Sequence, residues 1–177
     1  PPPPPPPRPH LFFFTPERET PLLRSLVGSE MCIRDRSKEV FSLLSTVNYL
    51  QSMNNIVNLR FERLLDNKKN ADGNFSQEGQ DEISDYHTKL VKQVKRLNKF
   101  FTKFDRAKAE KIMTKGQQYK DIEEKYRLEH FQRVSGDIAE SVATHQLHMD
   151  IMDMLKQMNI FIELIASTLL SIEEEKA

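Results

Sequence analysis

Apolar residues recur at alternating steps of three and four from Ser37 onward, which is the spacing of one buried helix face. In the first such segment, one helix face would carry seven apolar residues and one polar residue, Asn54. The face consists of Val40, Leu43, Val47, Leu50, Asn54, Val57, Phe61 and Leu64. Turn-forming residues come next, at 70–74. The pattern predicts a helix over about 38–67 that packs along its length.

Two more helices are predicted over about 76–104 and 106–134, with Ser76 and Asp105 as N-caps and Phe75 as a hydrophobic staple. The apolar face of the first of these helices is formed by Ile83, His87, Leu90, Val94, Leu97, Phe101 and Phe104. The next helix is more polar, so we expect it to bury one narrow face, made of Ile112, Tyr119, Ile122, Tyr126 and Val134.

Gly136 and Asp137 interrupt the pattern, because glycine often follows a helix end and aspartate can cap the next helix. The segment over about 138–172 then has the widest apolar face of the chain. Its two rows are made of Leu147, Ile151, Met154, Leu155, Met158, Phe161, Ile162, Ile165, Leu169 and Ile172. A face of this width needs partners on more than one side.

The fold class predicted from these segments is all-α, an antiparallel bundle of long helices. No stretch alternates as a strand would, and no proline occurs after residue 36 to interrupt a helix. The last three helices are expected to form a three-helix unit. The first helix either packs beside that unit or belongs to a preceding one.

Residues 1–36 have a different composition, since they hold all ten prolines and the only cysteine. The run from Ser25 to Asp35 resembles a translated sequencing adaptor of the transposon-end type, and a homopolymeric C tract would translate as the leading prolines. We therefore expect 1–36 to be a disordered, non-native segment and 37–177 to be a helical domain cut at Ser37. The alternative is a native proline-rich tail in the polyproline II conformation.

Charge and composition argue against several function classes. The chain has 26 basic and 26 acidic residues, so its net charge gives no reason to expect nucleic-acid binding. From Ser37 onward there is no cysteine, no glycine-rich phosphate loop and no nucleophile elbow, and we expect no enzymatic activity and no cofactor. The most apolar stretch, 151–172, is interrupted by Asp153, Lys156 and Glu163, so it is not expected to span a membrane.

Several stretches resemble the PhoU-like domain of sodium/phosphate cotransporter family proteins. Residues 140–144 and 148–159 look like its closing helix. Residues 75–79, with Glu82, Ile83 and His87, are similar to the start of its next-to-last repeat. Residues 126–130, with Arg133, resemble its third helix. The resemblance implies a regulatory domain on the cytoplasmic face of the cell membrane. Its partner would be the transmembrane part of the same transporter, absent from this sequence, which moves phosphate with sodium. The alternative is a free-standing PhoU-type phosphate-signalling adaptor.

PhoU proteins bind metal ions through carboxylates four residues apart on a helix. The corresponding positions are Gln51 and Asn55 in the first predicted helix, and Lys156 and Ile160 in the last. Amides are weaker ligands than carboxylates for hard cations, so no metal cluster is expected.

The histidines offer one more candidate for a metal site. His145, His148 and Asp150 have a spacing that a metal ion could use if another helix added a ligand, which leaves a metal-dependent enzyme as a third hypothesis. The favoured interpretation of His148 is a semi-buried residue of the helix seam. We expect His87 to form a hydrogen bond between helices and His130 to be exposed.

Basic residues are concentrated between Lys89 and Lys120. Lys92, Arg96, Lys99 and Lys103 share one side of the second predicted helix. A basic helix face gains about 1 kcal/mol per residue beside an anionic membrane, so membrane or anion contact is one hypothesis and an ordinary solvated face is the other. The width of the apolar face on the last helix favours self-association or docking onto the transporter.

Overall fold

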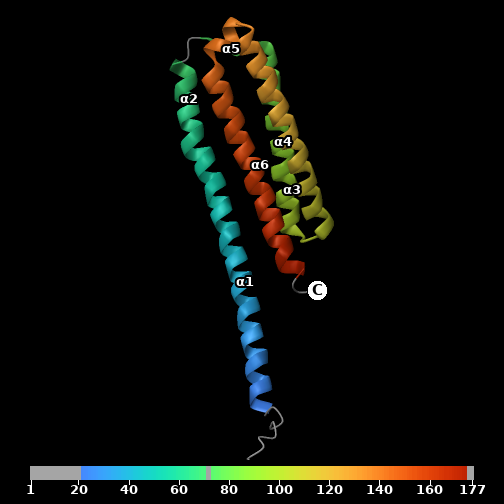
Figure 1. Ribbon diagram of the computed structural model, residues 1–177. Helices are drawn as coiled ribbons and strands as arrows, with labels where there is room; N and C mark the ends of the chain where they lie inside the picture. Colours follow the sequence, from blue (N-terminus) through green and yellow to red (C-terminus); the bar gives the residue numbers. More distant parts are fainter. Residues whose placement is uncertain (1–20, 71–72, 175–177) are drawn as a thin grey trace, which may run out of the picture. The chain divides into compact units, whose positions relative to one another are not determined.

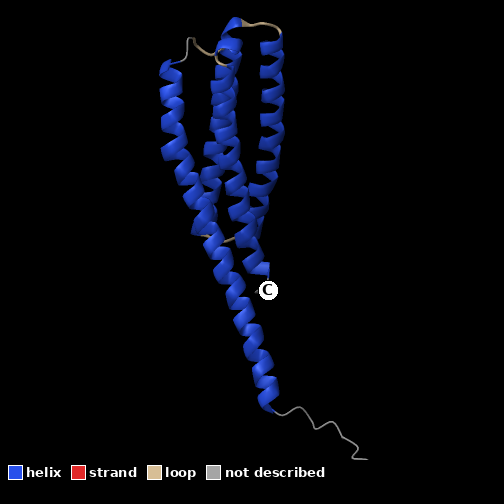
Figure 2. Cartoon of the chain, turned by 60° about the vertical axis from the view of Figure 1, so that its left-hand side comes forward, coloured by secondary structure: helices blue, strands red, loops and turns tan. Residues whose placement is uncertain are grey.

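The computed structural model describes the backbone of residues 21–70 and 73–174 and the side chains of residues 36–69 and 73–172. Every regular element in these ranges is a helix (Figures 1 and 2). The order is α1 (Pro21–Asn55), the π-helical turn η1 (Ile56–Arg60), α2 (Phe61–Asn70), α3 (Gln77–Thr102), α4 (Arg106–Ser135), α5 (Ala139–Ala143) and α6 (His145–Glu174). The prediction of an all-α bundle of long helices is confirmed. Residues 1–37 and 38–177 are separate units, and the helical core belongs to the second.

Helices α3, α4 and α6 pack against one another and form the predicted three-helix unit, with consecutive helices running in opposite directions (Figure 1). Helix α6 contributes more core residues than any other element, including Leu155, Ile162, Ile165 and Leu169. It contacts α3 and α4 on one side and η1 and α2 on another, as its wide apolar face predicted.

The predicted caps of α3 and α4 are confirmed. The Ser76 hydroxyl accepts a hydrogen bond from the Gly79 N–H at 3.2 Å, and the Asp105 carboxylate accepts one from the Ala107 N–H at 2.9 Å. Each bond satisfies a backbone donor that a helix start would otherwise leave without a partner.

The segment predicted as one helix over 138–172 is two helices, α5 and α6, because Thr144 leaves the helical conformation between them. The Thr144 hydroxyl donates to the Glu140 carbonyl at 2.7 Å. Asp137 does not cap the next helix. It takes the left-handed conformation with φ of 62°, and the residue at the N-cap of α5 is Ile138. Aspartate tolerates this conformation because its short side chain can bond locally.

The first helix is longer than predicted, since α1, η1 and α2 succeed one another without a break from Pro21 to Asn70. Pro21 occupies the first helical position, where its missing N–H costs nothing. Helix α1 therefore includes residues 21–36, which we expected to be disordered. The same expectation for residues 1–20 lies outside the described part of the chain.

The prediction of which face of the first helix is buried is wrong. Val40, Leu43, Val47, Leu50 and Val57 are between 40% and 58% exposed. Among the side chains described for this helix, from residue 36 onward, those that are buried are Thr46, Met53, Ile56 and Leu64.

Two contacts with α6 lie on the side of the first helix that carries these buried residues. The Tyr49 and Phe161 rings lie 6.0 Å apart, and Arg60 donates to the Gln157 side chain at 2.6 Å. In η1 the Phe61 N–H bonds to the Ile56 carbonyl, which is the wide spacing of a π-turn. The extra residue in this turn rotates α2 about the helix axis, so Leu64 is buried although Val57 and Phe61 remain about half exposed.

Helix α3 also buries a face shifted by one residue from the predicted one. Leu90 and Leu97 are buried as expected, but Glu82, Tyr86, Gln93 and Phe100 take the places predicted for Ile83, His87, Val94 and Phe101. The polar members are tolerated because they have partners. Gln93 donates to the Ile112 carbonyl at 3.0 Å, and Glu82 binds Arg133.

Among the described residues, one helix is long and apolar enough to cross a membrane by length and composition, spanning His145–Ile172. The core helix of a water-soluble bundle has the same properties, and the most apolar residues of α6 lie in the core between α3 and α4. Length and composition alone are therefore weak evidence that this helix crosses a membrane.

Candidate functional site

A basic groove lies between α3 and α4 near the loop that joins them. It has a volume of about 270 Å³ and is lined by Arg96 and Lys99 from α3 and by Lys108 and Lys111 from α4. Two of the four predicted contact residues, Arg96 and Lys99, therefore belong to a concave site. Lys92 and Lys103 are exposed and do not line it, although the Lys103 carbonyl accepts a hydrogen bond from the Lys108 ammonium at 3.1 Å.

Two side chains hold Arg96 in place in this groove. Its guanidinium donates to the Gln93 side chain at 3.0 Å and to the Tyr119 hydroxyl at 3.2 Å, and it lies 6.0 Å from the centre of the Tyr119 ring. A fixed guanidinium among lysines suits an anion with several oxygens, such as a phosphate group. The sequence pattern missed Lys108 and Lys111, because only the antiparallel pairing of the two helices brings them opposite Arg96 and Lys99.

A buried histidine cluster lies at the other end of the bundle, beside α5. His130 from α4 stacks on His148 from α6, with ring centres 4.0 Å apart and planes within 9°. The His130 Nε2 atom lies 3.1 Å from Nδ1 of His145. His130 and His148 are 1% and 0% exposed, so the prediction that His130 is exposed is wrong. It is turned inward, where its ring stacks against those of His145 and His148 at the start of α6.

Glu82 from α3 carries the negative charge of this cluster. It accepts two hydrogen bonds from the Arg133 guanidinium, at 2.8 Å and 2.6 Å, and it lies 3.2 Å from Nε2 of His148. Burial alone would raise the pKa of Glu82, but the hydrogen bonds and charges of His148 and Arg133 outweigh it and lower the pKa. Glu82 is therefore held as a carboxylate.

Burial has the opposite effect on the central histidine. Loss of solvent, helped by the charges of His148, Arg133 and His145, lowers the pKa of His130 to about 4, although Glu82 acts in the other direction. His130 is thus neutral near pH 7. Its Nδ1 atom is buried with no hydrogen-bond partner among the described residues, and the same is true of Nδ1 of His148.

The three residues proposed from sequence as weak metal candidates do not converge. His145 and His148 both join the cluster through His130, but the Asp150 carboxylate instead accepts a hydrogen bond from Gln146 on an exposed surface. Among the described residues, no three His, Cys, Asp or Glu side chains are placed to hold one metal ion. Gln51 and Asn55, at the positions that correspond by resemblance to the acidic motif of PhoU proteins, are both exposed on α1.

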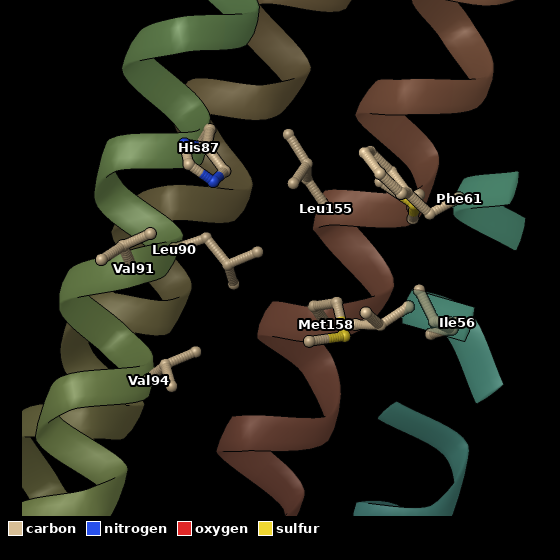
Figure 3. Close-up of a pocket in the computed structure, with 10 residues that line it drawn as sticks. Ile56, Phe61, His87, Leu90, Val91, Val94, Leu155 and Met158 are labelled. Carbon is tan, nitrogen blue, oxygen red and sulfur yellow. The ribbon is translucent and has the colours of Figure 1, made fainter. Parts of the chain in front are cut away.

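An apolar groove of about 280 Å³ runs between α3 and the first helix, with α6 as its floor (Figure 3). Ile56, Val57 and Phe61 line one wall. The rest is formed by His87, Leu90, Val91 and Val94 from α3 and by Met154, Leu155 and Met158 from α6. A second apolar cavity of about 230 Å³ continues it toward Phe75 and Leu147. His87 is thus an exposed groove residue rather than the interhelical hydrogen-bonding residue that we expected.

The middle of the three-helix unit holds a separate buried polar layer. Asn159 donates to the Gly116 carbonyl at 3.0 Å and to Glu163 at 2.8 Å. A side chain at Gly116 would come within 2.4 Å of Glu163, so this glycine allows α4 and α6 to approach closely. Glu123 is 0% exposed and pairs with Arg127 at 2.6 Å and Lys156 at 2.8 Å. Asn159 and Glu163 pair with each other, and Glu123 pairs with Arg127 and Lys156, which is the arrangement expected of a structural layer.

Comparison with known proteins leaves the function to be argued from this geometry. No family model, no curated protein and no solved structure matches the chain.

Proposed function

We propose that residues 37–177 form the cytoplasmic regulatory domain of a sodium-dependent phosphate cotransporter. One observation carries the proposal: the stretches that resemble the PhoU-like domain are far apart in sequence, yet their residues converge on the histidine cluster. Glu82 and Phe75 come from the first stretch, Arg133 and His130 from the second, and His148 from the third. Scattered similarities that meet in one buried cluster are what a shared structural core would produce.

Contacts at the edge of the cluster support the same proposal. The Phe75 ring meets His148 edge-on, with centres 6.3 Å apart, and the Ser141 hydroxyl lies 3.4 Å from that of Ser76. The Gly79 position is also close to His148, since an added Cβ would lie 3.5 Å from its ring. The resemblance therefore involves residues that tie the α5 end of the bundle together.

The two grooves indicate how such a domain would act. An apolar groove binds apolar side chains of another protein segment, and the basic groove binds an anionic surface or a phosphate group. The domain would thus regulate by docking to the transmembrane part of the transporter beside the membrane. It would not translocate the ion itself.

The unbroken gene tests the proposal directly. We expect its reading frame to encode several apolar helices ahead of Ser37. A frame that begins shortly before Val40 would contradict the proposal. An upstream soluble three-helix repeat with paired acidic residues would instead assign the chain to a PhoU-type signalling adaptor.

A further inference from the structure

The first helix presents an uncovered apolar face before the π-turn. Val40, Leu43, Val47, Leu50 and Val57 are 52%, 48%, 58%, 40% and 50% exposed, and Leu44 beside them is 58% exposed. The side of the helix that contacts the bundle is a different one, which carries Thr46, Met53 and Ile56. Val57, at the end of this face, also lines the apolar groove beside α6, whereas Val40, Leu43, Val47 and Leu50 do not, so a second helix can reach these four without displacing α6.

The order of residue types on this face is that of a two-stranded coiled coil. In a heptad that begins at Val40, the a positions are Val40, Val47 and Asn54, and the d positions are Leu43, Leu50 and Val57. β-Branched residues at a with leucine at d favour parallel dimers, and one buried asparagine at an a position specifies register and the two-stranded state. Asn54 is exposed, and its side-chain oxygen accepts a hydrogen bond from Asn58 at 3.0 Å.

The charge pattern of the same segment favours pairing with an identical surface. Residues 40–59 contain no Asp, Glu, Lys or Arg. Two copies of a charged surface repel each other, whereas amide and hydroxyl groups both donate and accept hydrogen bonds and so can pair with their own kind. Gln51, Asn54 and Asn58 supply such groups on or beside the exposed face.

The available area is that of a small, weakly bound dimer. Val40, Leu43, Val47 and Leu50 are each only 40–58% exposed, so symmetric pairing along them would bury less than about 1,000 Å² in total, the size range of weak interfaces. Because each first helix is already held against its own bundle, pairing does not have to order it.

From these observations we infer that the covering partner is a second copy of this chain. The two first helices pair in parallel along Val40, Leu43, Val47, Leu50, Asn54 and Val57, and they form a homodimer whose bundles lie outside the paired helices. The inference does not rest on the proposed transport function, since it comes from the exposed face alone.

Sedimentation equilibrium tests the inference on the full chain with Cys32→Ser, which removes the one thiol. We expect twice the 20.7 kDa mass of the chain. The double variant Leu43→Glu/Leu50→Glu should be a monomer with unchanged helix content, because both side chains are exposed in the monomer. Two single variants, Leu50→Glu and Leu59→Glu, add the same charge at different places. Leu59 is 57% exposed on the opposite side of the first helix. Leu50→Glu should weaken dimerisation at least tenfold and Leu59→Glu should not.

The orientation has its own measurement. In a parallel pair, residues at an a position meet their own counterparts, so Asn54→Cys should form a disulfide-linked dimer on mild oxidation, whereas Asn48→Cys, exposed on another side of α1, should not. A wild-type chain that stays monomeric at about 100 μM would overturn the inference and leave the face to another protein. Equal cross-linking of the two cysteine variants would overturn the parallel arrangement.

Discussion

At the scale of single residues, the α5 end of the bundle depends on an ion pair that has little contact with water. The Glu82 and Arg133 side chains are 7% and 13% exposed, and two hydrogen bonds join them. Replacing such a pair by apolar residues is often neutral, but removing one partner leaves a charge buried alone. The two residues should therefore be strongly coupled.

We expect Glu82→Ala to lower the free energy of unfolding by about 3–5 kcal/mol, because it leaves the Arg133 guanidinium buried without its partner. Urea unfolding followed by circular dichroism measures this. The matched control is Asp66→Ala, whose pair with Lys69 joins side chains that are 70% and 75% exposed, and it should cost less than about 1 kcal/mol. Equal losses in the two variants would show that burial does not determine the cost.

The histidine cluster predicts a dependence of stability on pH. The pKa of His130 is about 4 in the folded chain against an ordinary value of 6.5, so the unfolded chain takes up the proton first as the pH falls. The stability contributed by neutral His130 is complete above pH 6.5 and is lost progressively toward pH 4. At 1.36 kcal/mol per pKa unit, the loss is about 3 kcal/mol.

Unfolding free energies measured at intervals from pH 7.5 to pH 4 test this expectation. His130→Gln cannot take up the proton and should flatten the curve over that window. The groups that face His130 are His145 and His148 from α6, Arg133 from its own helix and Glu82 from α3, and they are unchanged in the variant. Identical curves for the two proteins would exclude His130 as the source of the dependence.

Sequence periodicity located the helices well and their buried faces less well. The reason is visible at Glu82 and Gln93, which are buried because partners from α4 and α6 reach them. A rule that places polar residues outside selects Ile83 and Val94 instead. His130 was misplaced for the same reason, since nothing in its own helix indicates that two histidines of α6 will stack against it.

At the scale of elements, the pairing of α3 with α4 turns two basic helix faces into one groove. The sequence of α3 alone predicted Arg96 and Lys99, which are half of the lining. Lys108 and Lys111 come from α4 and lie in the groove because the two helices pair side by side. The buried face of the first helix was missed for a related reason. The apolar residues of this helix follow steps of three and four along its whole length, which predicts one continuous buried face. The π-turn after Asn55 changes which side of the helix faces the bundle, and this turn is not visible in the spacing.

We expect the chain to bind vesicles that contain phosphatidylserine and not vesicles of phosphatidylcholine alone, because the four cations of the groove are attracted to anionic headgroups at about 1 kcal/mol each. Lys99→Glu/Lys108→Glu should reduce flotation with the anionic vesicles at least tenfold. The control is Lys69→Glu/Lys125→Glu, which changes the net charge equally on α2 and an exposed part of α4. Equal recovery with both lipids would contradict membrane docking.

At the scale of the whole molecule, a three-helix unit with a polar middle layer supports one additional long helix and leaves two kinds of surface uncovered. The all-α bundle and its three-helix unit were predicted from periodicity, whereas the grooves and the histidine cluster were not, since each joins residues from at least two helices. The two grooves are suited to docking, which agrees with the regulatory part of the proposed role.

Uptake of labelled phosphate by cells that express the complete protein tests this role most directly. We predict uptake that requires sodium, and we predict that a version without residues 38–177 keeps the sodium requirement but no longer adjusts its rate to the supply of phosphate. Absence of sodium-dependent phosphate uptake by the complete protein would contradict the proposal.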